Sequence, residues 1–493
     1  HEGGAATMAD AYARTSGEVG VLTLHQGCGL TNALTGITEA AKSRTPLLVL
    51  AAETGAAAVR SNFRIDQDAV ARAVGAVAER VHSARSAGAD VVRAYGICRD
   101  QRRTVVLNLP LDVQAETAVD AAVPTRVTWS PARPGPSAVT ALAGILERAE
   151  RPVFVAGRGA RDARAELEAL ADRCGALLAT SAVAHGLFAG HPWSLGISGG
   201  FATPLAVELI SGADVVVAWG ASLTMWTTRH GDLISPGATV VQVDDTIDAL
   251  GAQRPVDLAV LGDVAATARD VLDVVGANAG LRTGAVAARL RTDARHAAPA
   301  DDGSGDRIDP RVLSAALDGL LPAERTVAVD SGNFMGYPAG YLAVPDAAGF
   351  CFTQAFQSVG LGLATGVGAA LARPDRLAVA ACGDGGFLMG VSELETAVRL
   401  GLGMVVVVYD DAGYGAEFHH FADADQGCVR FPDVDLAAIA RGYGCDAAVV
   451  RSTADLHVVN EWLAGPRDRP LLLDAKVTAD APSWWLAEAF VGH

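Results

Sequence analysis

Two aspartates that each follow a β-type run have the chemistry of metal ligands. The apolar run 377–382 leads into a turn that contains Asp384, and the apolar run 404–409 is followed by Asp411. A helical segment over 391–400 lies between the runs, so the three segments predict a strand–helix–strand unit with parallel strands. Both aspartates are then neighbours at one edge of the sheet, where α/β sheets bind ligands.

The glycines around Asp384 fit a phosphate-binding turn. Gly383, Gly385 and Gly386 let the backbone approach a phosphate closely and direct N–H groups toward it. Two carboxylates at one edge repel each other unless a cation lies between them, and Mg²⁺ combines carboxylate ligands with phosphate oxygens and water. The pattern predicts a Mg²⁺–diphosphate site. The simpler alternative is that Asp384 is a turn residue and Asp411 caps a helix.

Composition and segment order predict several α/β domains around these residues. A chain of 493 residues, half of them hydrophobic, has enough apolar surface for two to four domains, and its valine-rich runs are typical of buried parallel strands. Strand-like and helical segments alternate within three stretches, which we predict as domains at 1–115, 137–275 and 308–493. The Pro-bearing segment 116–136 and the Ala- and Arg-rich segment 276–306 are predicted connectors.

Charge and cysteine content exclude some partners. The formal net charge of −17 argues against nucleic acid or an anionic membrane as a partner. The seven cysteines are scattered without a metal or disulfide pattern, which favours a cytoplasmic location. No apolar run reaches the ~18–20 residues of a membrane span. We therefore expect a small-molecule substrate.

The third domain resembles a known family through its motifs. The segment GDGGF at 383–387 and the later Gly413-Tyr414-Gly415 closely resemble the signature of thiamine diphosphate (ThDP) enzymes. In that signature the aspartate of GDG, a later asparagine and a backbone carbonyl two residues beyond bind Mg²⁺ on the diphosphate. The resemblance assigns these metal-binding roles to Asp384, Asp411 and the Gly413 carbonyl; the departure is Asp411, which keeps an oxygen ligand but adds a negative charge. The other residues expected near the cofactor in this domain are Ser331, Gly332, Asn333, Gly383, Gly385, Gly386 and Tyr414.

The first domain resembles the pyrimidine-binding domain of the acetolactate synthase and 2-oxo acid decarboxylase group. The matching motifs follow in order: His1-Glu2, 8–14, 27–32, 47–50 and Asn108-Leu109-Pro110 with Asp112. The family normally has one more βαβ unit, of ~30 or more residues, ahead of the His-Glu pair. We therefore expect that this N-terminal unit of the domain is missing from the sequence.

The second domain resembles the central domain of the family, which holds FAD or another nucleotide in some members. Its lone Gly157-x-Gly159 is a weak nucleotide signal. We expect a packing and interface domain, with FAD as the alternative. Together the resemblances imply an α/β protein of three doubly wound domains with mostly parallel sheets: pyrimidine-binding, central and diphosphate-binding.

The resemblance also implies catalytic roles. Glu2 matches the glutamate that hydrogen-bonds N1′ of the aminopyrimidine, which implies an apolar pocket that raises its pKa. Val359 matches the bulky apolar residue that bends the cofactor. His25 matches an active-site histidine of benzoylformate decarboxylase, and Glu417 matches the acid/base glutamate of pyruvate and indolepyruvate decarboxylases. Each of these four residues has a purely structural role as its alternative. Further candidates for the substrate pocket are Gln26, Gln67, His419 and His420.

We therefore expect a ThDP- and Mg²⁺-dependent enzyme, a lyase or transferase, that decarboxylates a 2-oxo acid. The resulting enamine would be protonated to an aldehyde or ligated to a second carbonyl. An acetolactate synthase-type carboligase is the nearest alternative, and a catalytically silent ThDP-fold binding or regulatory protein is an alternative of another class. The family places each cofactor between two subunits, which implies a homodimer or homotetramer.

Overall fold

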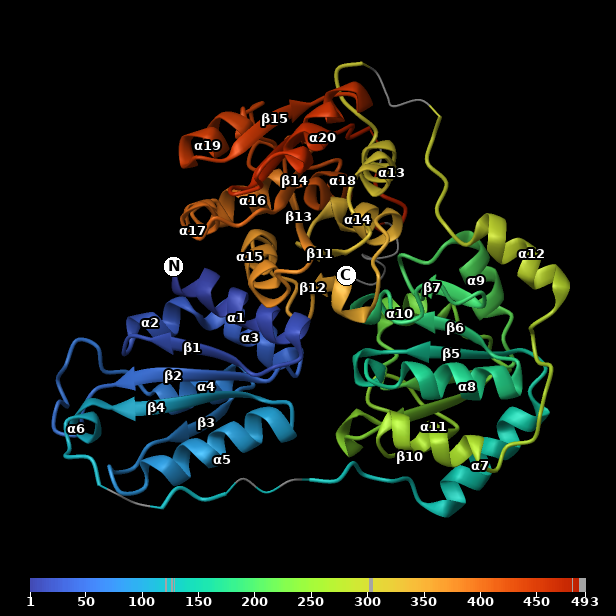
Figure 1. Ribbon diagram of the computed structural model, residues 1–493, viewed down its shortest axis with the longest axis horizontal. Coiled ribbons are helices and arrows are strands. Elements are labelled where there is room, and N and C mark those ends of the chain that lie inside the picture. The colour runs from blue at the N-terminus through green and yellow to red at the C-terminus, as the bar shows by residue number, and fades with distance from the viewer. Residues whose placement is uncertain (120–121, 126, 128, 301–304, 481, 487–493) are drawn as a thin grey trace.

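The computed structural model describes residues 1–493 except 120–121, 126, 128, 301–304, 481 and 487–493. In the described residues the strands form three separate sheets, all parallel, with helices packed around them (Figure 1). The predicted fold class, three doubly wound α/β domains with parallel sheets, is confirmed. The strands of each sheet fall within one of the three predicted domain ranges, although the exact domain limits stay a prediction. No helix among the described residues is both long and apolar enough to cross a membrane.

The first sheet has the strand order β1-β2-β4-β3. Its domain contains α1 (Glu2–Ser16), β1 (Gly20–Leu24), α2 (Cys28–Asn32), α3 (Leu34–Lys42), β2 (Leu47–Glu53), α4 (Gln67–Ala73), β3 (Val77–Arg80), α5 (Ala87–Asp100), β4 (Thr104–Pro110) and α6 (Leu111–Gln114). The His1 side chain caps α1 by accepting a hydrogen bond of 3.1 Å from the Gly3 amide. The helix therefore begins at Glu2. The Glu2 side chain lies near Gly29, as does His25, which follows β1.

The second sheet has the strand order β10-β9-β8-β5-β6-β7. Its elements are α7 (Pro136–Arg148), β5 (Pro152–Ala156), α8 (Arg164–Cys174), β6 (Leu177–Thr180), β7 (Ser194–Ile197), α9 (Pro204–Ser211), β8 (Val215–Trp219), α10 (Met225–Thr228), β9 (Thr239–Asp244), β10 (Leu258–Leu261), α11 (Val264–Leu272) and α12 (Gly284–Asp293). The chain around Gly157 and Gly159 packs directly on Gly220, and a Cβ on Gly157 would collide with the Gly220 carbonyl oxygen. Close packing therefore explains these glycines without a bound nucleotide.

The third sheet has the strand order β12-β11-β13-β14-β16-β15. Its elements are α13 (Pro310–Leu320), β11 (Arg325–Val329), α14 (Gly336–Tyr341), β12 (Phe350–Phe352), α15 (Gly362–Ala372), β13 (Leu377–Gly383), α16 (Asp384–Gly390), α17 (Glu393–Arg399), β14 (Val405–Asp410), α18 (Gly415–His420), α19 (Leu436–Tyr443), β15 (Asp446–Val450), α20 (His457–Ala464) and β16 (Leu471–Lys476). Strands β13 and β14 are parallel neighbours, with Gly383 opposite Tyr409. The predicted strand–helix–strand unit is present, but two helices connect its strands, and the first of them begins at Asp384 itself.

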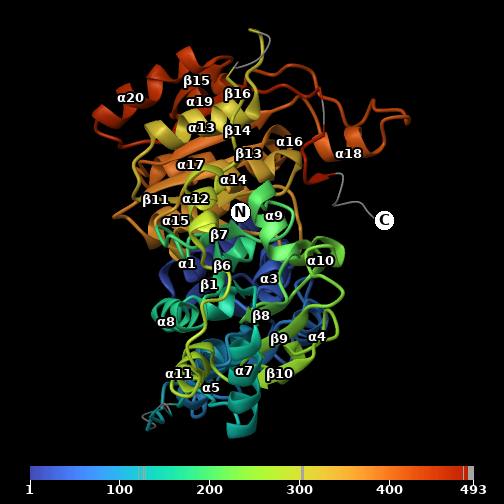
Figure 2. The same cartoon turned by 90° about the vertical axis from the view of Figure 1, so that its right-hand side faces the viewer.

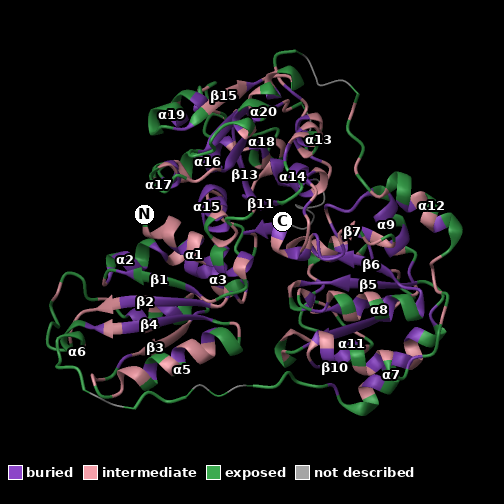
Figure 3. Ribbon diagram, viewed as in Figure 1, coloured by how far each residue is buried: buried purple, intermediate pink, exposed green. Residues whose placement is uncertain are grey.

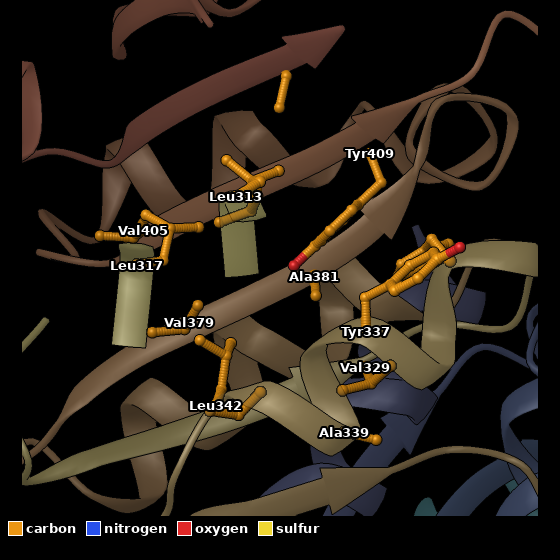
Figure 4. Packing of buried hydrophobic residues seen from close by; sticks show 14 of the residues in the cluster. Leu313, Leu317, Val329, Tyr337, Ala339, Leu342, Val379, Ala381, Val405 and Tyr409 are labelled. Atoms are coloured by element: carbon orange, nitrogen blue, oxygen red, sulfur yellow. The ribbon is translucent and has the colours of Figure 1, made fainter. Parts of the chain in front are cut away.

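The core of the third domain fixes the strands that carry the two aspartates. Val379 of β13 and Val405 of β14 pack with Leu313 and Leu317 of α13 (Figure 4). Tyr409, at the end of β14, is buried and its hydroxyl lies 2.8 Å from Ser314 Oγ. The sheet strands are largely buried in all three domains, whereas the outer faces of the helices are exposed (Figure 3). Rigid apolar packing thus holds both strand ends at one edge.

Candidate active site

A cavity of about 340 Å³ lies at the carboxyl ends of β13 and β14. The structure brings together here most of the predicted site residues of the third domain: Ser331, Gly332, Asn333, Val359, Gly383, Asp384, Gly385, Gly386, Asp411, Gly413, Tyr414 and Glu417. The cavity is also lined by residues that the sequence did not predict, among them Met225, Trp226, Gln354, Gln357, Trp485 and Leu486. Figure 2 shows α16, α18 and α10 along one side of the molecule. The second domain therefore contributes one wall of a cavity built on the third.

Asp384 and Asp411 both line this cavity, and their charges act on each other. Burial, reinforced by the charges of Asp411 and Asp410, raises the pKa of Asp384 to about 8. Loss of solvent, with the charge of Asp410, likewise raises the pKa of Asp411 to about 7. Asp410 is paired with Lys476, whose Nζ donates to Asp410 Oδ2 at 2.6 Å. Neither Asp384 nor Asp411 forms a salt bridge within the described part of the chain, so the pair favours a bound cation.

The donor set fits Mg²⁺ bound to a diphosphate. The described residues contain no group of three or more His, Cys, Asp or Glu side chains that could hold a metal by themselves. A site with two carboxylates leaves room for phosphate oxygens and water, which is the coordination that Mg²⁺ prefers. The Gly413 carbonyl oxygen accepts no hydrogen bond from a described backbone amide, so it is available as a third ligand.

The glycines after Asp384 are required by close packing. A Cβ on Gly385 would lie 2.5 Å from Tyr414 Cε1. A Cβ on Gly386 would lie 2.5 Å from Asp330 Oδ2 and 3.2 Å from Val359 Cγ1. Larger residues would displace the cavity wall, so the turn keeps its backbone close to the space between β13 and β14.

Comparison with known proteins matches the whole arrangement. Three thiamine pyrophosphate enzyme models match the chain: the N-terminal TPP binding domain over residues 1–72, the central domain over 139–271 and the C-terminal TPP binding domain over 330–475. A sulfoacetaldehyde acetyltransferase of Alcaligenes xylosoxydans xylosoxydans is 30% identical, across 92% of this chain and 82% of its own length. The chain belongs to the thiamine pyrophosphate enzyme family. The predicted resemblance is confirmed, and the protein is a ThDP-dependent enzyme.

Other relatives have different reaction names. A probable 2-ketoarginine decarboxylase, AruI of Pseudomonas aeruginosa, is 30% identical over 92% of this chain and 82% of its own length. The acetolactate synthase large subunit of Parasynechococcus marenigrum is 28% identical over 93% of this chain and 76% of its own length. These names include a decarboxylase, a synthase and an acetyltransferase, so the comparisons give the cofactor class and leave the reaction to further argument.

For this ThDP enzyme, Val359 is positioned by a residue that the sequence prediction missed. Asp330 is buried at the end of β11 and accepts hydrogen bonds of 3.1 Å from the Gly360 and Leu361 amides and 2.8 Å from the Ser331 amide. Burial raises the pKa of Asp330 to about 6 despite these donors. Its position directly after a strand and directly before Ser331 is the sequence signal that could have identified it.

Helix α18 brings one of its three predicted residues to the cavity. Glu417 lines the cavity and is exposed, whereas His419 and His420 are not among the lining residues. Burial lowers the pKa of His419, and its Nε2 atom is buried with no hydrogen-bond partner in the described residues. The roles of the two histidines in a substrate pocket stay predictions, since neither lines the cavity of this chain.

The predicted residues of the first domain lie together but away from this cavity. Asn32 Nδ2 donates to Glu2 Oε2 at 3.2 Å, and both Glu2 and His25 lie beside Gly29. The His25 ring contacts Phe63, with ring centroids 5.1 Å apart. Hydrogen bonds from the backbone of Glu2 itself and from Asn32 lower the pKa of Glu2. The predicted raised pKa is therefore not found in this chain, because these hydrogen bonds outweigh the effect of burial on the carboxylate.

The two predicted glutamines have different surroundings. Gln67 is buried, and its Oε1 accepts from the Gly27 amide at 2.8 Å while its Nε2 donates to Asn108 Oδ1 at 2.7 Å. Gln67 thus stabilises the turn at Gly27, whose φ of +62° favours glycine. Gln26 Oε1 is buried without a hydrogen-bond partner in the described residues. Neither glutamine lines the cavity of this chain.

Proposed function

We propose that the protein uses ThDP and Mg²⁺ to decarboxylate a 2-oxo acid. The observation that carries the proposal is the pair Asp384 and Asp411, which faces one cavity from adjacent parallel strands without a counterion in the described structure. Burial and the neighbouring carboxylates disfavour ionisation of both groups and raise their pKa values, and a bound divalent cation would offset this cost. One of the relatives is named a probable 2-ketoarginine decarboxylase, which supports this reaction class.

The third domain would bind the cofactor through its diphosphate. Asp384, Asp411 and the Gly413 carbonyl would hold Mg²⁺, and the amides at Gly385 and Gly386 would face phosphate oxygens. Val359, which lines the cavity beside Gly386, would support the bent form of the cofactor. Bound ThDP supplies the electron sink that makes the loss of CO₂ from a 2-oxo acid possible.

The first domain would act from a second subunit. Glu2, His25 and Asn32 lie at the carboxyl end of the first sheet, and none of them lines the cavity of the same chain. A homodimer that places this group over the cavity of its partner would complete the site, and a homotetramer of two such dimers would do the same. Covering Glu2 would also remove it from water and raise its pKa, as its role at N1′ of the aminopyrimidine requires.

Proton transfer to the product would use groups on both sides of the completed site. Glu417 is exposed at the cavity, and His25 is exposed beside Glu2. Histidine and glutamate are both common general acid–base groups, which suits protonation of the enamine and release of an aldehyde.

Transfer to a second molecule is the alternative outcome. The relatives named sulfoacetaldehyde acetyltransferase and acetolactate synthase favour it. The aromatic residues Trp226 and Trp485 line the cavity and supply an apolar surface for a substrate side chain or an acceptor.

The test is turnover with ThDP, Mg²⁺ and a panel of 2-oxo acids, 2-ketoarginine among them, with sulfoacetaldehyde as a further substrate. CO₂ release with an aldehyde product supports the proposal, and a ligated product supports the carboligase alternative. Tight ThDP binding without any turnover across the panel would contradict both and support a catalytically silent protein.

A further inference from the structure

The backbone segment between β12 and α15 forms one wall of the cofactor cavity. Gln354, Gln357 and Val359 line the cavity from this segment. Gln357 has a φ of +61°, a left-handed conformation that non-glycine residues rarely adopt. A strained residue in an irregular segment keeps its conformation only when surrounding groups hold it.

The group that holds this segment comes from the first domain. Glu39 of α3 is 1% exposed, and its Oε1 accepts from the Ala355 amide at 3.1 Å while its Oε2 accepts from the Phe356 amide at 2.6 Å. Arg14 of α1 donates to the Phe352 carbonyl oxygen at 3.0 Å and to Glu39 Oε1 at 2.8 Å. Side chains of the first domain therefore hydrogen-bond the backbone at Phe352, Ala355 and Phe356. These contacts lie directly before the strained Gln357.

The groups around the Glu39 carboxylate favour its ionised form. Burial opposes ionisation, but Arg14 and the two backbone amides outweigh it and hold the pKa of Glu39 below its ordinary value. Hydrogen bonds to a charged acceptor are stronger than neutral ones. Asp10 is also buried and pairs with Arg14, its Oδ1 accepting from Nε at 3.0 Å, but it forms no hydrogen bond with the segment. The two carboxylates thus share one arginine, and only Glu39 reaches the cavity wall.

We propose that Glu39 is a positioning residue for ThDP binding: it fixes the backbone at Ala355 and Phe356 and thereby places Gln357 and Val359 against the cofactor. The inference depends on ThDP binding in the cavity but not on the identity of the substrate. In the proposed dimer each first domain then serves two sites, because Glu2 acts on the partner's cofactor and Glu39 shapes the wall of its own chain's cavity.

The test compares Glu39→Gln with Asp10→Asn as a matched control. Glu39→Gln keeps the side-chain size but turns an NH₂ group toward a backbone amide. Loss of one charge-assisted hydrogen bond predicts an increase of about tenfold in the Kd for ThDP at saturating Mg²⁺. Amide hydrogen exchange over residues 353–361, measured without cofactor, should also accelerate relative to the rest of the third domain. Asp10→Asn should reduce thermal stability and leave both readouts near those of the wild type.

The outcomes separate a positioning role from a structural one. If Glu39→Gln lowers the Tm as Asp10→Asn does, but leaves the Kd for ThDP and the exchange of 353–361 unchanged, the inference is wrong. If Glu39→Gln does not fold, Glu39→Asp is used instead, because it keeps the charge on a shorter side chain. An unchanged Kd for ThDP and unchanged exchange over 353–361 in that variant would also contradict the inference. A wild-type protein that fails to bind ThDP would overturn the proposed function itself. Equal ThDP binding by the wild type and Glu39→Gln would overturn only the role of Glu39.

Discussion

Oδ2 of Asp384 accepts a hydrogen bond of 2.8 Å from the backbone amide of Gly413. This bond fixes the turn after β14 against the carboxylate that follows β13, so the three proposed metal ligands are positioned before any cation binds. The Gly413 amide thus orients the carboxylate of Asp384. The Gly413 carbonyl oxygen accepts no hydrogen bond from a described backbone amide, so the same residue also offers the third proposed ligand.

Replacing Asp384 by asparagine should weaken cofactor binding strongly and disturb folding less. Asparagine keeps the size of the side chain and one oxygen, but it removes a charge that faces the cation. We expect the Mg²⁺-dependent affinity for ThDP to fall about 100-fold, in the range seen when groups around a metal are changed. Calorimetric titration of ThDP with Mg²⁺ checks this. The exposed Asp423→Asn is the control, and equal affinities in the two variants would contradict the assignment.

The raised pKa values of Asp384 and Asp411 predict a pH dependence with a defined sign. In the metal-free folded protein the two groups have pKa values of about 8 and about 7, above the ~3.9 of an aspartate in an unfolded chain. The folded state then binds more protons than the unfolded state, so metal-free stability should fall as pH rises from about 4 to about 8. Mg²⁺ affinity should rise between about pH 6 and pH 8, because the ion binds the ionised pair.

Asp411→Asn tests this origin directly. With one buried carboxylate removed, the decline of metal-free stability with pH should become shallower in urea denaturation series. The pH profiles of wild type and variant would coincide if the acidic pair were not the cause.

Glu2→Gln should separate catalysis from cofactor binding. The glutamine keeps a hydrogen bond to Asn32 but cannot deliver a proton to the aminopyrimidine. We expect kcat to fall about 100-fold or more, as for loss of a general acid or base, with little change in the Kd for ThDP. Steady-state assays with the active 2-oxo acid measure this. Glu18→Gln, an exposed carboxylate beyond the end of α1, should keep full turnover, and full turnover in Glu2→Gln would remove Glu2 from its proposed role.

Gly386→Ala should destabilise the third domain as well as weaken ThDP binding. The added methyl group would lie 2.5 Å from Asp330 Oδ2 and 3.2 Å from Val359 Cγ1, so the cavity wall must move. Overpacking of this kind costs about 1–3 kcal/mol of unfolding free energy. Gly442→Ala is the matched control, because a Cβ at that helical position meets no atom within 4 Å. Urea denaturation measures both changes, and equal effects would show that the Gly386 contact is not constraining.

The strand ends of the cofactor cavity could be predicted because their signals are local. The apolar runs before Asp384 and Asp411 form buried parallel strands, as predicted. The signal is their continuous valine- and alanine-rich sequence. The strand β7 has no such local signal, because Ser194–Ile197 alternates buried and half-buried residues at the edge of its sheet. The strand β3 also lacks a continuous apolar run, and none of its residues is fully buried.

The rest of the cavity could not be predicted because it depends on contacts between domains. Trp226 comes from the second domain and Trp485 from the segment after β16, and no periodic pattern relates either residue to Asp384. Gln67, predicted for the substrate pocket, is buried and bonded to Gly27 and Asn108, contacts that only the fold reveals. In the sequence Glu39 is one more charged residue of a helical segment. Only the fold shows that it accepts hydrogen bonds from the Ala355 and Phe356 amides.

A crystal structure of the protein with ThDP and Mn²⁺ in place of Mg²⁺ tests the central claim most directly. The account predicts an anomalous peak within ~2.0–2.3 Å of an oxygen of Asp384, an oxygen of Asp411, the Gly413 carbonyl and the diphosphate. It would be contradicted by a diphosphate bound outside the cavity between β13 and β14, or by a metal peak that Asp384 and Asp411 do not contact.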